Sequence, residues 1–120
     1  MQDDKAVKFF EEVLSKTRAG KIRWEPTADE SDYIAAIGGH FTLSISEGQN
    51  PYQTTYPINL PPTMCTLALK DQDGRVLTKV TDMDEGIPER DIRELYETAR
   101  RQALHVDEKI DTILGELSKL

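Results

Sequence analysis

The sequence has few of the residues that would point to a particular biochemistry. It contains one cysteine and two histidines, so it offers neither an intramolecular disulfide nor a cluster of thiolate and imidazole metal ligands. It has no Gly-x-Gly-x-x-Gly or Walker-type phosphate motif and no Gly-x-Ser-x-Gly nucleophile motif. We therefore expect no catalytic residues, no metal and no cofactor.

Long apolar runs and excess basic charge are also absent. No stretch approaches the ~20 apolar residues of a membrane span, and the N-terminal residues lack the apolar core of a signal peptide. The chain has 15 Lys and Arg against 22 Asp and Glu, a net charge of −7, which is the wrong sign for binding phosphate backbones or anionic lipid. We expect a cytoplasmic protein with neither nucleic acid nor membrane as a partner.

The isolated cysteine and histidines favour structural roles. Cys65 lies in the apolar segment 64–69, which favours a buried thiol over a reactive one. His40 and His105 have no second histidine or cysteine at metal-ligand spacing. Each is more consistent with an exposed or half-buried structural histidine than with a ligand.

Hydrophobic periodicity indicates an α+β fold in a single domain covering residues 1–120. Apolar residues at spacings of 3 and 4 predict a helix over 4–18, and Gly20 suits the residue after its end. From Lys21 the period changes to two, which predicts about five antiparallel strands in meander order over 21–80. A long helix is expected over 88–119.

Two turn signals and one interruption organise the expected sheet. Gly38-Gly39 between alternating segments predicts a hairpin, and Asp71-Gln-Asp-Gly74 predicts a second one. The Asp71 and Asp82 segments each resemble fragments of a calcium loop, but neither supplies its full ligand spacing. The segment 47–62 is rich in proline and carries Tyr52 and Tyr56, so it is either a binding loop or a strap over the core.

The C-terminal helix carries a regular apolar stripe. From Ile92 its apolar residues advance by 4 and 3 in turn through four heptads to Leu120. The uninterrupted phase favours one rod over a break at His105, and about thirty residues would span roughly 45 Å, longer than a small domain is wide. Either the stripe only covers the sheet, or its distal half forms a homodimer through Val106, Ile110, Ile113 and Leu117.

Most of the negative charge lies in two connections. Residues 25–32 contain four acids and no base, residues 81–91 contain five acids and one arginine, and the rest of the chain is left at +1. These acids either keep the connections solvated or attract a basic protein partner. On the long helix, Arg100 has no acid four residues away on either side and is expected to be available to a ligand or another chain. The candidate partner-binding residues are Glu25, Asp29, Glu30, Asp32, Tyr52, Tyr56, Asp82, Asp84, Glu85 and Arg100.

The string 94–108 and the segment Gly20-Lys-Ile-Arg-Trp-Glu-Pro26 resemble small uncharacterised bacterial proteins with a helix, a sheet and a long terminal helix. The resemblance implies no activity. The leading hypothesis is a non-enzymatic bacterial or phage protein-interaction module that acts as a homodimer, of the inhibitor or immunity type. The alternative is a sensor domain that binds a small ligand or nucleotide through Tyr52, Tyr56 and Arg100.

Overall fold

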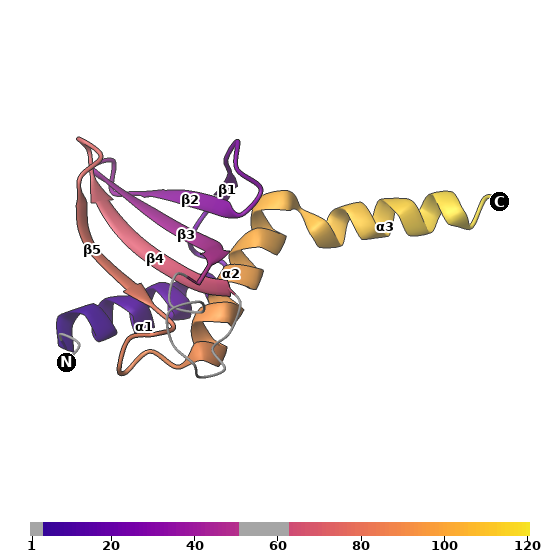
Figure 1. Cartoon of the computed structure of the whole chain (residues 1–120). Coiled ribbons are helices and arrows are strands. Elements are labelled where there is room, and N and C mark those ends of the chain that lie inside the picture. The colour runs from indigo at the N-terminus through magenta and orange to yellow at the C-terminus, as the bar shows by residue number, and fades with distance from the viewer. Residues whose placement is uncertain (1–3, 51–62) are drawn as a thin grey trace.

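The computed structural model describes residues 4–50 and 63–120, and the fold is α+β as the sequence predicts (Figure 1). A five-stranded sheet carries two helices on one face, and a third helix extends away from it. In chain order the elements are α1 (Asp4–Arg18), β1 (Glu25–Pro26), β2 (Asp32–Ile37), β3 (Phe41–Gln49), β4 (Thr63–Asp71), β5 (Val76–Thr81), α2 (Glu89–Leu104) and α3 (Val106–Leu117).

The predicted antiparallel meander is confirmed. The strand order is β1-β2-β3-β4-β5, and each strand pairs antiparallel with the next. Gly38 and Gly39 both have positive φ at the β2–β3 turn, a conformation that glycine adopts without a Cβ clash. The β4–β5 turn is formed by Asp71, whose Oδ1 accepts hydrogen bonds from the Asp73 and Arg75 amides at 2.9 Å each. This arrangement accounts for the Asp71 segment as turn chemistry.

One face of the sheet forms the core with α1 and α2. Inward-facing residues alternate along the strands because successive side chains point to opposite faces. The strands contribute Tyr33, Ala35, Leu43, Ile45, Cys65, Leu67 and Val80, and α1 and α2 cover them with Ala6, Phe10, Val13, Leu14, Ile92, Leu95, Tyr96, Ala99 and Ala103. Cys65 is fully buried, and burial raises the pKa of its thiol to about 12, which keeps it protonated and unreactive at neutral pH.

The prediction of one continuous C-terminal helix is wrong. The helix ends at Leu104, His105 adopts the left-handed conformation with φ 53°, and α3 begins at Val106. Core contact along the predicted stripe stops at Ala103, and no residue of α3 is buried. Packing against the sheet therefore holds only the α2 half of the stripe, and the left-handed residue sends α3 in a different direction (Figure 1).

Arg93 ties the start of α2 to the ends of three strands. Its guanidinium donates to Asp82 Oδ2 after β5 at 2.9 Å, to the Thr63 carbonyl of β4 at 2.7 Å and to Glu47 Oε2 of β3 at 3.4 Å. Glu89, one turn earlier on α2, accepts a further bond at 3.2 Å. The Asp82 side chain is only 2% exposed, so the ion pair with Arg93 supplies the charge that compensates its burial.

Replacing Arg93 by methionine should destabilise the fold by about 3 kcal/mol at neutral pH, because it leaves the buried Asp82 carboxylate without its cation. Urea unfolding followed by circular dichroism measures the loss. The matched control is Arg90→Met, on the exposed side of the same helix turn, which should stay within about 0.5 kcal/mol of the wild type. Equal losses in the two variants would contradict the role given to Arg93.

The deficit of Arg93→Met should also depend on pH. Burial raises the pKa of Asp82 above its ordinary 3.8, and Arg93 opposes that rise. Without Arg93 the folded-state pKa of Asp82 rises further, so stability is lost as the pH rises from the unfolded-state pKa through the folded one. The difference in unfolding free energy between variant and wild type should be smaller at pH 4 than at pH 7. A constant difference would show that the buried carboxylate is not the cause.

Candidate functional site

The most conspicuous surface is helix α3. Its side chains Val106, Ile110, Ile113, Leu114 and Leu117, here called the α3 stripe, lie on one face because they recur at spacings of 3 and 4. The last four are 43%, 51%, 57% and 54% exposed. Scattered apolar residues are common on protein surfaces, whereas a contiguous apolar stripe on a helix with no fully buried residue makes α3 a candidate interaction site.

The junction at His105 fixes the direction in which α3 leaves the domain. The His105 amide donates to the carbonyls of Arg101 and Gln102, which closes α2 in the manner of a left-handed cap. Arg101 forms an ion pair with Asp107 across the break, and His105 Nδ1 lies 3.5 Å from Glu108 Oε1. These contacts are exposed, so the backbone conformation at His105 is the main constraint on α3.

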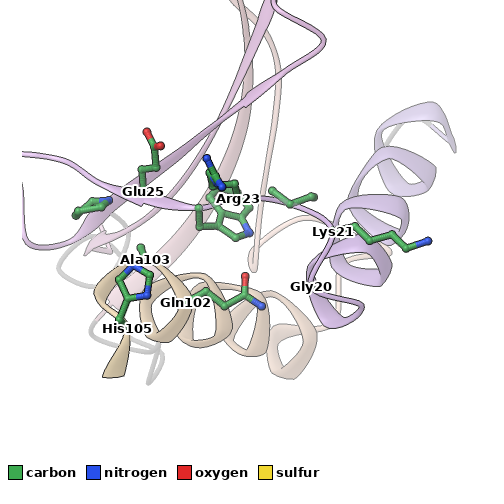
Figure 2. A pocket seen from close by; sticks show the side chains of 10 residues that line it. Gly20, Lys21, Arg23, Glu25, Gln102, Ala103 and His105 are labelled. Carbon is green, nitrogen blue, oxygen red and sulfur yellow. The ribbon is translucent and has the colours of Figure 1, made fainter. Parts of the chain in front are cut away.

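A cleft of about 760 Å³ lies between the end of α2 and the segment 20–26 (Figure 2). Arg23 and Glu25 stand on the strand side, and Gln102 and His105 on the helix side. The two walls are joined at Thr17, whose Oγ1 accepts from Trp24 Nε1 at 3.1 Å and whose carbonyl accepts from Gln102 Nε2 at 3.1 Å. These two hydrogen bonds hold the two walls of the cleft in place relative to each other.

The two acidic segments lie at different ends of the domain and form no common face (Figure 1). Glu25, Asp29 and Glu30 are exposed around the β1–β2 turn, and Glu85 is exposed in the β5–α2 connection. Two of the predicted acids serve the fold, because Asp82 pairs with Arg93 and Asp84 Oδ2 accepts from the Thr81 amide at 2.8 Å. Asp32 is partly buried at the start of β2, where its Oδ1 has no hydrogen-bond partner among the described residues. Burial raises the pKa of Asp32, and Lys70 partly offsets that rise.

The remaining candidates are not gathered around one site. Arg100, predicted to be available to a ligand or another chain, has a side chain that is 40% exposed, and its guanidinium lies 3.3 Å from Glu97 Oε1 three residues earlier. Tyr52 and Tyr56 lie outside the described residues. Among the residues that the structure describes, no group of three His, Cys, Asp or Glu side chains is placed to hold a metal ion. Within that same part of the chain, no helix is long and apolar enough to cross a membrane.

Sequence reasoning missed the residues that shape the junction. Gln102 and Arg23 carry no motif, and only the tertiary packing of α2 on the segment 20–26 brings them to one cleft. His105 had a weak signal, since Asp107 and Glu108 two and three residues later suit the first turn of a new helix. The heptad repeat continues through His105 without a change of phase, and it therefore led to the prediction of one continuous helix.

Replacing His105 by glycine should raise the free energy of unfolding by about 0.5 kcal/mol, because glycine adopts a positive φ without the steric cost of a Cβ. Urea unfolding followed at 222 nm measures the change. His40→Gly is the matched control, because His40 has no positive φ and gains nothing from the substitution. A loss of 0.5–1 kcal/mol in His105→Gly would instead indicate that residue 105 lies inside one continuous helix.

No protein-family model matches the chain, and no curated protein or solved structure is significantly similar to it. Of the surfaces described above, the exposed apolar face of α3 is the most distinctive.

Proposed function

We propose that this protein is a non-enzymatic protein-interaction module that acts as a homodimer, with the α3 stripe as the dimer interface. The observation that carries the proposal is the unsupported apolar face of α3. A 12-residue helix of about 18 Å extends from the domain and places Ile110, Ile113, Leu114 and Leu117 in solvent. An amphipathic helix is stabilised mainly by burying its apolar face, so α3 needs a protein surface to cover it.

A helix that presents anchors at i, i+3, i+4 and i+7 fits a recurring mode of protein recognition, in which the apolar face lies in a hydrophobic groove. Covering these half-exposed side chains contributes roughly 1 kcal/mol each, half the gain of full burial. In a symmetric dimer each contact occurs twice, which doubles the apolar area removed from water. The exposed acids at the β1–β2 turn and Glu85 remain outside α3 and are available to a basic protein partner.

A small-ligand sensor is the second candidate, and the cleft in Figure 2 is the observation that favours it. Its volume of about 760 Å³ falls within the range of ligand sites, and Arg23, Glu25 and Gln102 supply polar groups. This site differs from the one expected at Tyr52, Tyr56 and Arg100. It lies beside the base of α3, so a bound ligand would contact the helix junction at His105.

Ile113→Asp should convert the dimer to a folded monomer, measured by light scattering coupled to size-exclusion chromatography. An aspartate in the interface loses the burial of isoleucine and adds an unpaired charge, so we expect the dimer dissociation constant to rise at least about 100-fold. The matched control is Thr112→Asp, which adds the same charge on the opposite face of α3 and should remain dimeric.

Two results would contradict the proposal. A monomeric wild type at micromolar concentration would reject the homodimer directly. An Ile113→Asp variant that unfolds would show that the α3 stripe belongs to a core, because a solvent-exposed stripe tolerates the charge in the monomer.

A thermal-shift panel of nucleotides and metabolites distinguishes the second candidate. A ligand at one hundred times its dissociation constant stabilises the protein by ~2.7 kcal/mol, so a true ligand gives a clear shift. The interaction module predicts no such shift. A shift that disappears in Arg23→Ala would assign a ligand to the cleft and favour the sensor.

A further inference from the structure

The inner face of the sheet is longer than the two helices that cover it. Ile37 and Phe41 face each other across the β2–β3 turn and continue the inward-facing rows that begin at Tyr33 and Ile45. Tyr33 and Ile45 are buried, whereas Ile37 is 38% and Phe41 42% exposed. The sheet therefore presents core-type residues to solvent at the end that carries its two hairpin turns.

These residues line an open apolar groove of about 600 Å³ beside α1. Phe9 of α1 and Ile22 form the opposite wall, and both are only partly buried. Charged side chains also line the groove: Glu12 and Lys16 of α1, and Lys21, which follows the helix. The groove is a sheet surface that lacks a helix, and α3 is a helix that lacks a sheet surface.

We propose that α3 of one copy docks in this groove of a second copy, and that the exchange is reciprocal. The inference rests on the proposed homodimer and names the surface that receives the α3 stripe. His105 is the single residue between α2 and α3, and its left-handed conformation directs α3 away from the end of the sheet that carries the β2–β3 and β4–β5 turns (Figure 1). The same arrangement leaves both α3 and the groove open to a second molecule.

Charge supports this occupant over a packing of α3 against α3. Helix α3 has four acids and one lysine, so two copies packed together bring like charges near one another. The 100° step of a helix places Asp107 and Asp111 beyond one edge of the stripe, and Lys109 together with Glu116 along the other. The charged side chains that line the groove are Glu12, Lys16 and Lys21, a net charge of +1, so docking brings α3, with a net charge of −3, toward opposite charge.

Buried area also favours the reciprocal arrangement. Packing α3 on α3 covers the two stripes and leaves both grooves in water. Docking each stripe in a groove covers both apolar surfaces, twice in one dimer, and the two-fold symmetry closes the assembly without an open chain. The aromatic ring of Phe41 is well suited to act as the anchor, since aromatic side chains dominate interface energetics.

A disulfide test locates the contact directly. Protein carrying Phe41→Cys is mixed with protein carrying Ile113→Cys, and the mixture is oxidised with oxidised glutathione. The native Cys65 is fully buried and does not interfere. We expect a covalent dimer between the two different variants on non-reducing gels. One variant carries a size tag so that the mixed dimer runs apart from each homodimer, and a covalent homodimer of Ile113→Cys with no mixed dimer would overturn the proposal in favour of α3 packed on α3.

A charge variant of the groove gives an independent measurement. Phe41→Asp should raise the dimer dissociation constant about 100-fold or more in light scattering, as Ile113→Asp does, while its circular dichroism spectrum keeps the wild-type shape. His40→Asp is the matched control, because it adds the same charge at the neighbouring exposed turn residue and should remain dimeric. If Phe41→Asp loses the folded spectrum, the disulfide result decides.

The two proposals fail in different ways. A monomeric wild type removes the homodimer and the groove docking together. A dimeric wild type that Ile113→Asp dissociates and Phe41→Asp leaves intact keeps the homodimer and rejects the groove as its receiving surface.

Discussion

The ion pair between Arg93 and Asp82 is the contact on which the position of α2 depends. It joins the first turn of α2 to the connection after β5, and the same guanidinium reaches the ends of β3 and β4. A carboxylate with 2% exposure requires a cation, so this geometry has little freedom. With its start held there, α2 crosses the sheet and ends beside the segment 20–26, where α3 departs. The placement of the proposed interaction surface thus begins with a buried charge at the opposite end of α2 from α3.

The long apolar stripe of the C-terminal region serves two purposes. Its first half, from Ile92 to Ala103, is core, and its second half, the α3 stripe, is surface. A 3.5-residue repeat gives no information about which protein surface it faces, because a sheet and a second helix both accept it. The left-handed residue at His105 separates the two halves without disturbing the repeat. This separation makes α3 a distinct helix whose apolar face is exposed.

The domain leaves two apolar surfaces uncovered, one on its sheet and one on its last helix. Its sheet exposes Ile37 and Phe41 on the core-facing side, and its last helix exposes an apolar stripe. In a chain of 120 residues with 38% apolar content, leaving both in water forfeits a substantial part of the available burial. In the proposed homodimer a second copy covers both surfaces. The proposed homodimer then completes the same two-layer packing that α1 and α2 begin within one chain.

The sequence by itself determined the α+β class, the first helix and the antiparallel meander, because alternating side chains and turn residues such as Gly38-Gly39 and Asp71 act locally. It also identified Ile110, Ile113 and Leu117 as an apolar set. Only the tertiary structure decided that α2 and α3 are separate and that Asp82 is internal. The physical reason is that burial depends on what packs against a residue, and the partners of Asp82 and of the groove come from distant parts of the chain.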